Sequence, residues 1–304
     1  MKQRHFLKPS DFSYSEINQI LKETLLFKKR RETIRKKTLT GKIIGLFFQK
    51  SSTRTRISFE VGIKELGGEN IFLTRENTQV KRGESFSDTF RVLERYFHCL
   101  IIRNNDHDVL ENLSKTSTIP IINGLSNRHH PCQVLADAFT INEHVAKPKI
   151  AYVGDGNNVA TSLIELCSLL KWPLRVTTPP SHACPKSVLK DCLVNDRWIE
   201  FNHHPQSAVK GCNVIYTDTW FSMGDKESKA NKLKAFKGFQ VNDRLLKDAT
   251  KDYIFLHCLP AYRGLEVSES IIDGKHSKVF DQAENRLHVQ KAILSFLFTQ
   301  LKRR

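Results

Sequence analysis

The chain has 304 residues, of which 39% are hydrophobic and 26% are charged, a balance typical of a soluble globular protein. No apolar run approaches the roughly 18 residues of a membrane-spanning helix, the first residues lack the apolar core of a signal peptide, and the seven cysteines have no paired spacing. We therefore expect a cytoplasmic protein of two domains, with reduced thiols and no disulfide framework.

The formal net charge of +16 and the isoelectric point near 9.6 favour binding of anions, either nucleic acid or small anionic substrates. The densest basic run, from Lys28 to Lys37, falls in an expected amphipathic helix from Tyr14 to about Lys37. No RNA-binding motif accompanies this run. A solvated helix face is the simpler interpretation, and a basic nucleic-acid-binding protein is the alternative, which steeply salt-dependent binding of oligonucleotides would reveal.

A buried strand is predicted at Ile43–Phe48, and a helix follows from Ile57 to Leu66, ended by Gly67 and Gly68. Between them lies a segment rich in hydroxyl and guanidinium groups, Ser51–Arg56. The first amides of a helix have no internal partner and carry partial positive charge, so a phosphate there would find several aligned donors. The alternative is an ordinary Ser/Thr helix cap flanked by solvated arginines.

Strands and helices alternate through the rest of the first half, apart from a polar stretch from Thr74 to Ser87 without apolar periodicity. The expected elements are the strands Gly68–Leu73, Cys99–Arg103 and Ile119–Gly124 with its turn, and the helices Phe86–Phe97 and Cys132–Val145. This alternation predicts a parallel sheet, whose ligands lie at the carboxyl ends of its strands. We place the domain boundary on the helix that starts at Cys132.

A second alternating series begins with the strand Ile150–Val153. Its other strands are expected at Leu174–Thr177, Ile199–Asn202, Val214–Asp218 and Ile254–Cys258, and its helices at Val159–Lys171, Lys186–Asn195 and Gln206–Lys210. A last helix is predicted at Leu287–Leu301. The fold class is therefore α/β, with a mainly parallel sheet in each domain.

The segment Gly154–Val159 lies between a predicted strand and a predicted helix, as glycine-rich turns do in dinucleotide-binding folds. Val159 occupies the position of the third glycine, and Thr177–Pro180 ends the next strand without an acidic residue for a ribose. A nicotinamide cofactor is therefore not expected. The turn still suits the presentation of Asn157 and Asn158 to a polar substrate.

Histidines and a cysteine that are close in sequence raise the question of a metal site. Neither the set His129, His130 and Cys132 nor the pair His203 and His204 has the spacing of a zinc site. We expect neither a metal nor an organic cofactor.

Two segments at predicted strand ends carry reactive side chains. Cys258 and His257 are the residues of a possible nucleophilic pair, but neighbours on a strand point to opposite faces, so a packed thiol and a buried histidine are the simpler interpretation. The segment Asp218–Gly224 leaves its strand with a carboxylate and a hydroxyl group. Its place at a strand end favours a functional role.

Together these segments resemble the aspartate/ornithine carbamoyltransferase family, and within it the ornithine branch. The similarity extends from about His5 to the end of the chain. The matching motifs are the phosphate motif Ser52–Arg56, the His-Pro-x-Gln motif His130–Gln133, the two ornithine-branch motifs Asp218–Gly224 and His257–Pro260, and Glu284–Arg286.

The resemblance implies two αβα domains. Residues 1–138, with a C-terminal helix of about 287–304 packing back on them, would bind carbamoyl phosphate, and residues 139–286 would bind ornithine. The implied reaction moves the carbamoyl group of carbamoyl phosphate to the side-chain amine of L-ornithine and gives L-citrulline and phosphate. A homotrimer with shared sites, and no nucleic-acid or membrane partner, would perform it. The segment Ala261–Val267 resembles biosynthetic members of the family, which implies arginine biosynthesis.

The resemblance also assigns individual residues. Those for carbamoyl phosphate are Ser52, Thr53, Arg54, Thr55, Arg103, His130, Gln133, Cys258, Leu259 and Arg286, with Gln79 reaching in from a neighbouring subunit. Those for ornithine are Asn158, Asp218, Ser222 and Met223. The catalytic groups would be Arg103, His130, Asp218 and Cys258. Lys81 departs from the family pattern, because a small residue, usually glycine, is expected there in the loop that carries Gln79.

The residues suit this chemistry. Negative charge grows on the carbonyl oxygen as the amine attacks, and one donor to such an oxygen is typically worth ~10²- to 10³-fold in rate. Arg103, His130 and Thr55 are suitable donors, and Arg54 would stabilise the departing phosphate. Phosphate in a mixed anhydride is already a good leaving group, so the step requires no metal.

The nucleophile sets the second requirement. An amine with a pKa of about 10.4 is neutral only ~0.1% of the time near neutral pH, and a carboxylate beside it would favour the charged form further. We therefore assign Asp218 to the α-amino group and Cys258 to the side-chain amine. Aspartate carbamoyltransferase is the alternative within the family, but it would need basic residues for a second carboxylate and a lysine in the mobile loop. Gln79 and Asp218–Gly224 favour a cationic amino acid instead.

Overall fold

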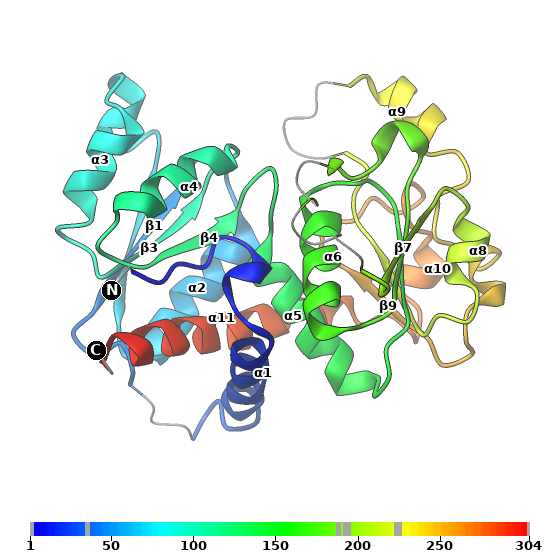
Figure 1. Cartoon of the computed structure of the whole chain (residues 1–304), viewed down its shortest axis with the longest axis horizontal. Coiled ribbons are helices and arrows are strands. Elements are labelled where there is room, and N and C mark those ends of the chain that lie inside the picture. The colour runs from blue at the N-terminus through cyan, green and yellow to red at the C-terminus, as the bar shows by residue number, and fades with distance from the viewer. Residues whose placement is uncertain (1–2, 34–36, 187–189, 191–195, 222–226, 303–304) are drawn as a thin grey trace. The chain divides into compact units, whose positions relative to one another are not determined.

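The computed structural model describes residues 3–33, 37–186, 190, 196–221 and 227–302. Figure 1 shows the chain, which divides into two compact units. Unit 1 comprises Met1–Ala136 and Glu284–Arg304, and unit 2 comprises Asp137–Ala283. The chain passes from one unit to the other inside two helices, α5 (Pro131–His144) and α11 (Val279–Lys302). No helix within the described ranges is long and apolar enough to cross a membrane.

Unit 1 contains a parallel sheet of four strands in the order β2-β1-β3-β4. Its strands are β1 (Ile43–Phe48), β2 (Glu69–Thr74), β3 (Cys99–Arg103) and β4 (Ile121–Leu125). The bounds of β1 and β3 are those that the apolar runs predict. Since β1 lies between β2 and β3, the connections after β1 and β3 leave the sheet in different directions and open a crevice at their carboxyl ends.

Helices cover both faces of this sheet. Figure 1 shows α2 and α11 on one side and α3 and α4 on the other. The unit contains α1 (Tyr14–Lys29), α2 (Thr53–Glu65), α3 (Phe86–Leu93), α4 (His107–Thr116) and the short 3-10 turns η1 (Pro9–Asp11) and η2 (Gln79–Arg82). The expectation that α1 reaches Lys37 is wrong. The helix ends at Lys29, because its last buried residue is Phe27 and only charged residues follow until Glu32.

The C-terminal helix packs on unit 1, as the family resemblance implied. A Cβ added to Gly62 of α2 would lie 3.1 Å from Cγ of Lys291 on α11, so the two helices approach closely where α2 has no side chain. The ring of Phe296 meets the ring of Phe12 edge-on at 5.2 Å between centroids.

Unit 2 contains five parallel strands in the order β7-β6-β5-β8-β9. The strands are β5 (Ile150–Val153), β6 (Leu174–Thr177), β7 (Ile199–Asn202), β8 (Val214–Thr217) and β9 (Ile254–His257). The order changes direction at β5, so the segments after β5 and β8 border the unit's own crevice. The parallel α/β fold predicted from the sequence is confirmed in both units.

Helices also lie on both faces of the second sheet, with α6 on one side and α8 and α10 on the other (Figure 1). They are α6 (Asn158–Leu170), α8 (Pro205–Val209), α9 (Lys229–Ala235) and α10 (Glu269–Ile272), with the 3-10 turns η3 (Pro180–His182) and η4 (Leu245–Asp248). Most of the helix predicted at Lys186–Asn195 lies outside the described residues.

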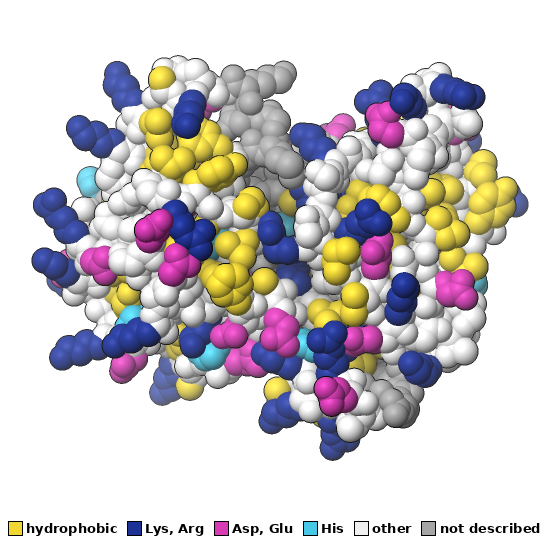
Figure 2. Space-filling view, turned by 180° about the vertical axis from the view of Figure 1, so that it is seen from behind, with side chains coloured by type: hydrophobic (Ala, Val, Ile, Leu, Met, Phe, Trp, Pro, Cys, Tyr) yellow, Lys and Arg dark blue, Asp and Glu magenta, His cyan; other side chains and the backbone are white. Residues whose placement is uncertain are grey.

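The basic side chains on one face of the molecule are mixed with acidic ones. On the face in Figure 2, Lys and Arg are scattered over the surface and interspersed with acidic groups. Arg31, within the densest basic run, pairs with Glu65 of α2 at 2.9 Å. This distribution favours solvated helix faces over a nucleic-acid groove.

Candidate active site

The segment Ser51–Arg56 lies where the sequence placed it, between β1 and α2. Ser52 precedes the helix in an extended conformation, and its side chain makes no capping hydrogen bond. The first turn of α2 contains no acidic residue. The alternative interpretation, an ordinary serine cap, is therefore wrong for Ser52, and the helix start retains the positive character that suits an anion.

A pocket of about 600 Å³ adjoins this helix start. It is lined by the segment after β1, the first turns of α2 and the carboxyl end of β2: Phe48, Gln49, Lys50, Ser51, Ser52, Thr53, Arg56, Ile57, Phe72, Thr74, Arg75 and Glu76. The guanidinium of Arg56 lies 3.8 Å from the centroid of the Phe72 ring and pairs with Glu60 at 2.8 Å, so it is held in the wall. Gln79, on η2, does not line this pocket.

A buried guanidinium organises the residues behind the helix start. Arg286 of α11 is 2% exposed, and it donates to Oγ1 of Thr55 at 2.9 Å and to Oε1 of Gln133. It therefore connects the beginnings of α2 and α5. The sequence connected these three residues only through the family resemblance, because they come from distant parts of the chain.

Three guanidinium groups give this part of unit 1 a strong positive potential. Burial, with the charges of Arg286 and Arg54, lowers the pKa of Arg103 to about 10. Burial and the charges of Arg286, Arg103 and Arg54 also hold the pKa of His130 well below its ordinary value, so its imidazole is neutral. A phosphate dianion would offset the mutual repulsion of these groups, and a neutral imidazole can still donate one hydrogen bond.

Cys132 is a buried, hydrogen-bonded thiol. Burial raises the pKa of its thiol to about 12, and the thiol donates to the carbonyl oxygen of Asn123 at 3.6 Å. His129 contacts the ring of His107 at 4.8 Å between centroids. The thiol, a metal ligand only as thiolate, is thus kept protonated.

In unit 2, a carboxylate lies at the centre of the candidate amino-acid site. Asp218, directly after β8, is 4% exposed. Its Oδ2 accepts from Nδ2 of Asn157 at 2.7 Å, and its Oδ1 accepts from Sγ of Cys258 at 2.9 Å and from the backbone of Thr219 at 2.7 Å. These three donors hold the carboxylate in place.

Asn157 has two tasks in this arrangement. Its Oδ1 accepts from the backbone amides of Val159 and Ala160 and so caps α6, while its amide nitrogen holds Asp218. Asn158, the residue predicted to bind ornithine, is the first residue of α6 and is half-buried. The sequence suggested that both asparagines face a substrate. It could not show that Asn157 holds Asp218 in place, because the two residues are 61 positions apart in the chain.

The expectation that His257 and Cys258 point to opposite faces is wrong. Together with Asp218, their ligand atoms all lie within 4.8 Å of one another, because β9 ends at His257 and Cys258 lies beyond the strand. The thiol bonds to Asp218, while Nδ1 of His257 accepts from the backbone of Leu259 at 2.9 Å. A Cys–His nucleophilic pair is therefore not formed.

The predicted residues are distributed over both units. Unit 1 holds the residues at or just before the starts of α2 and α5, Arg103 at the end of β3, Gln79 and Arg286. Unit 2 holds Cys258 and Leu259, which were also assigned to carbamoyl phosphate. Leu259 packs against the core of unit 2. Ser222 and Met223 lie outside the described residues.

One buried ion pair was not anticipated. Nζ of Lys232 on α9 lies 3.0 Å from Oδ2 of Asp155, with the two side chains 4% and 13% exposed. Asp155 belongs to the turn after β5 that presents Asn157. No local pattern could have identified this pair, because its partners are 77 positions apart.

Comparison with known proteins gives full-length matches. The family model described as the carbamoyl-P binding domain of aspartate/ornithine carbamoyltransferase matches residues 4–143, and the model of the Asp/Orn binding domain matches residues 146–297. Proteins named ornithine carbamoyltransferase from Nitratiruptor sp. and Methylococcus capsulatus are 44% and 41% identical to the chain. They cover 97% and 98% of it, and the matches include 97% and 100% of those proteins.

Solved structures agree. Ornithine carbamoyltransferase from Pyrococcus furiosus aligns with a TM-score of 0.90 at 43% identity, over 97% of each chain. Anabolic ornithine carbamoyltransferase from Campylobacter jejuni aligns with a TM-score of 0.90 at 39% identity, over 99% of this chain and 100% of that one.

Proposed function

Because the chain belongs to the aspartate/ornithine carbamoyltransferase family, we propose that it carbamoylates the side-chain amine of L-ornithine with carbamoyl phosphate, giving L-citrulline and phosphate. The observation that carries the ornithine assignment is the buried Asp218 carboxylate with its three donors, beside the thiol of Cys258. An anionic centre of this kind favours a cationic amino acid and disfavours the second carboxylate of aspartate.

The phosphate half of the substrate is assigned to unit 1. Ser52, Thr53 and Arg54 supply amide, hydroxyl and guanidinium donors at the positive start of α2. Arg103 and the neutral His130, with the hydroxyl of Thr55, act on the carbamoyl oxygen, where charge develops in the transition state. Gln133 and Arg286 support them, since Arg286 bonds to both Gln133 and Thr55.

The amino acid is assigned to unit 2. Asp218 pairs with the α-ammonium group of ornithine, while Asn158 and the segment containing Ser222 and Met223 hold the rest of it. Cys258 and Leu259 approach the carbamoyl group, and Cys258 faces the side-chain amine. The amine must be neutral to attack, so we keep Asp218 away from it. Alignment of the two bound reactants can supply roughly 7 to 11 kcal/mol toward the barrier.

A substrate comparison tests this proposal. Ornithine, putrescine, N-acetylornithine and aspartate are offered in parallel with carbamoyl phosphate, and the carbamoylated product is measured. We expect product from ornithine. Putrescine carries the same two amines but lacks the α-carboxylate, N-acetylornithine has an uncharged amide in place of the α-ammonium group, and aspartate has no side-chain amine to carbamoylate. Preferential carbamoylation of any of the other three compounds would refute the assignment.

The assembly is a further part of the proposal: a homotrimer in which Gln79 of one subunit completes the site of the next. The pocket beside Ser52 and Thr53 supports this, since Gln79 of the same chain does not line it. Nζ of Lys81 pairs with Glu76 at 2.7 Å, and Glu76 lines the pocket. Lys81, where the family is expected to have a small residue, therefore lies at the edge of this pocket.

Subunit mixing tests the shared site. The inactive variants Arg54→Ala and Gln79→Ala are unfolded together and refolded as a mixture. If each site uses Arg54 of one subunit and Gln79 of the next, roughly a quarter of the sites in a random equal mixture regain both residues. Each variant refolded alone is the control. Failure of the mixture to exceed these controls would contradict shared sites.

Pathway and compartment complete the proposal. The likeness of Ala261–Val267 to biosynthetic members and the similarity to the anabolic Campylobacter jejuni protein support a role in arginine synthesis. The six described cysteines are free thiols, which suits the reducing cytoplasm. Growth of an arginine-requiring bacterial strain that lacks this activity, rescued by the chain without added arginine, is the expected result.

A further inference from the structure

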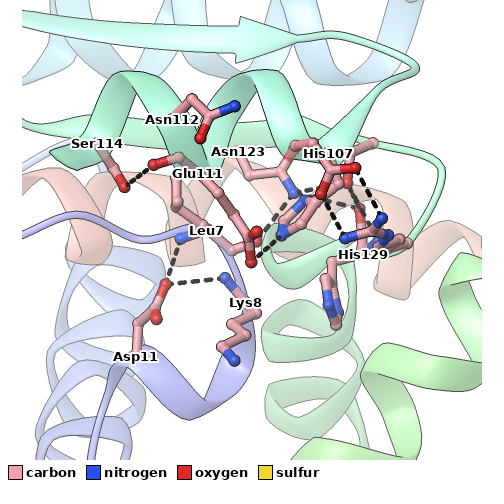
Figure 3. A network of polar contacts seen from close by, with 12 residues as sticks. Leu7, Lys8, Asp11, His107, Glu111, Asn112, Ser114, Asn123 and His129 are labelled. Atoms are coloured by element: carbon pink, nitrogen blue, oxygen red, sulfur yellow. Dashed lines mark hydrogen bonds and ion pairs between the residues drawn. The ribbon is translucent and has the colours of Figure 1, made fainter. Parts of the chain in front are cut away.

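A buried polar network lies beside His130 in unit 1 and takes no part in the proposed reaction. Figure 3 shows it between the N-terminal segment, α4 and the end of β4. The side chains of His107, Asn123 and His129 are at most 3% exposed, and Ser126 is fully buried. Among the described residues, Nε2 of His107 and Oδ1 of Asn123 have no hydrogen-bond partner. Nδ1 of His107 and Nδ2 of Asn123 bond within the network, which therefore favours one arrangement of the chain here.

The hydroxyl of Ser126 is the centre of this network. Its Oγ lies 2.8 Å from Nδ1 of His107, and it accepts from Nδ2 of Asn123 at 3.1 Å and from the backbone of His129 at 3.2 Å. The Ser126 backbone amide also donates to the carbonyl oxygen of His129 at 2.9 Å. Both backbone polar groups of His129 are therefore bound to Ser126.

His130 is the next residue, and its other side is held as well. Its carbonyl oxygen accepts from the amides of Gln133 and Val134 in the first turn of α5. The peptide of His130 thus lies between the Ser126–His129 turn and a helix start. A displaced turn would move the His130 imidazole relative to Arg103 and Thr55.

The N-terminal segment holds the network from the opposite side. Asn123 donates to the carbonyl oxygen of Leu7 at 2.9 Å. The amides of Leu7 and Lys8 both donate to one carboxylate oxygen of Asp11, at 2.6 and 3.0 Å, which sets the direction of that carbonyl (Figure 3). Asn123 is therefore bound both to this segment and to Ser126.

The hydrogen bonds of Ser126 favour one state of His107. A hydroxyl has one hydrogen and two lone pairs, and Asn123 and His129 occupy the lone pairs. The hydroxyl hydrogen can go to Nδ1 of His107 at 2.8 Å or to the carbonyl oxygen of His129 at 3.3 Å. The shorter contact favours an unprotonated Nδ1, with Nε2 carrying the ring's hydrogen toward Glu111, 3.7 Å away. Asp108, Arg128 and Lys8 also face this ring, and Arg128 is itself paired with Asp108 at 2.7 Å. The titratable ring of His129 lies beside the His107 ring, at 4.8 Å between centroids.

We propose that His107 is a positioning residue for His130. His107 acts through its hydrogen bond to Ser126 and through the turn from Ser126 to His129. The inference rests on the proposed function, because His130 is taken to bind the carbamoyl oxygen. Protonation of His107 would place a third donor on the two lone pairs of Ser126. One of the bonds that hold the turn would then be lost.

Three variants test the proposal. His107→Leu removes the acceptor, and His107→Asn restores a polar group near the position of Nδ1. The matched control is His98→Leu, because Nδ1 of His98 accepts from the backbone of Ile43 at 3.2 Å in the same unit, at the opposite end of the strands. Citrulline formation gives kcat, calorimetry gives the affinity for inorganic phosphate, and thermal unfolding reports the fold.

We expect kcat of His107→Leu to fall roughly 10- to 100-fold, because misplacement by about 1 Å can cost that much. The phosphate affinity should not change, since the start of α2 holds phosphate. His107→Asn should recover most of the rate, and His98→Leu should keep the wild-type rate. An unchanged kcat in a folded His107→Leu protein would overturn the proposal, as would equal losses of kcat and phosphate affinity.

A pH profile separates positioning from simple packing. The ornithine amine must lose its proton before it attacks, so the wild type and His107→Asn share one limb at higher pH that this amine sets. Burial lowers the pKa of His107 from its ordinary value of 6.5, so the wild-type kcat should show a second acid limb below that pH. In His107→Asn this limb should disappear or move to lower pH. An identical second limb in both proteins would count against the role of His107.

A crystal structure of His107→Leu gives a readout that does not depend on activity. The Ser126–His129 turn and the His130 side chain should be displaced relative to the wild type, and unchanged positions would overturn the proposal. If the wild type forms no citrulline, the proposed function fails, and the crystal structure alone still decides the positioning role.

Discussion

Arg286 shows how one side chain can serve both stability and binding. It is almost completely buried, yet its guanidinium bonds to Thr55 and Gln133. A buried charge without partners is strongly unfavourable, so the two polar partners are required for folding as well as for the site. Sequence patterns alone do not reveal such a residue, because it interrupts the apolar periodicity of its helix.

Arg54 is the residue whose loss should affect the phosphate most directly. Arg54→Ala should lower kcat/KM for carbamoyl phosphate by roughly 100-fold or more, since charge-assisted donors to a phosphate and to developing charge are lost. The fold should be retained, because Arg54 is only half-buried. Steady-state kinetics and thermal unfolding measure the two effects. Lys64→Ala, an exposed change on the last turn of the same helix, is the control and should behave as wild type.

Asn157 permits a sharper test of the amino-acid site. Asn157→Asp would place a second carboxylate where Nδ2 now donates to Asp218 at 2.7 Å. Loss of that bond and repulsion between the two charges should raise KM for ornithine roughly 10- to 100-fold, which corresponds to about 1.5–3 kcal/mol for a hydrogen bond to a charged group. KM for carbamoyl phosphate is the internal control. An unchanged KM for ornithine would argue against the position assigned to Asp218.

At the level of elements, the turn after β5 owes its conformation to close packing. A Cβ added to Gly156 would lie 2.3 Å from the backbone nitrogen of Cys184, and the amide of Gly156 donates to the carbonyl oxygen of His182 at 2.9 Å. The glycine therefore allows a neighbouring backbone to approach. This explains the resemblance to a dinucleotide-binding turn without a dinucleotide.

Gly156→Ala should consequently destabilise unit 2 by about 3 kcal/mol or more, because the added methyl group meets backbone atoms that have little freedom to move. Urea unfolding measures this change. The control is Gly238→Ala, whose Cβ would meet no atom within 4 Å although its φ is +90°. That change should cost only about 1–2 kcal/mol, the penalty of a left-handed conformation. Equal effects of the two substitutions would contradict the packing argument.

The strands were the easiest elements to predict, because a buried parallel strand is an almost continuous apolar run. The bounds of β1, β3 and β5 follow from such runs. The bounds of β6 and β7 also match the prediction, although β6 contains Arg175 and β7 is largely exposed. The sequence pattern did not indicate α4. One of the buried positions of this helix is His107, which contributes a hydrogen bond to Ser126 and interrupts the apolar pattern. The start of α11 was placed too late for a similar reason, since Gln282 and Arg286 are buried and polar.

The hydrogen bonds between site residues could not be predicted from the sequence. Alternation of elements predicts which strand ends share an edge, and it brought Asp218 and Cys258 to the same edge. It does not predict which side chains bond there. The thiol of Cys258 bonds to Asp218 because β9 ends at His257, one residue before Cys258.

At the level of the whole molecule, buried histidines link stability to pH. Burial lowers the pKa of His129 to about 3, whereas the unfolded chain takes up this proton near the ordinary value of 6.5. Between these values the unfolded state binds more protons, so the free energy of unfolding falls as the pH falls. The stabilisation is complete above about pH 6.5 and is lost toward pH 3.

His129→Gln removes this titration. Between about pH 6 and pH 4, the free energy of unfolding of the wild type should fall more steeply than that of the variant, by about 1.4 kcal/mol per pH unit for one proton. Urea unfolding at several pH values measures both slopes. Parallel slopes would show that His129 takes up its proton equally easily in the folded and unfolded states.

The composition of unit 1 from two separate chain segments has a consequence for its biosynthesis. Unit 2 is a single uninterrupted segment, 137–283, whereas Arg286 and the remainder of α11 return to unit 1. As the chain leaves the ribosome, the second unit is complete before the first. The usual order, in which the amino-terminal domain folds first, is therefore reversed, and a nascent chain arrested at residue 283 would contain no finished phosphate site.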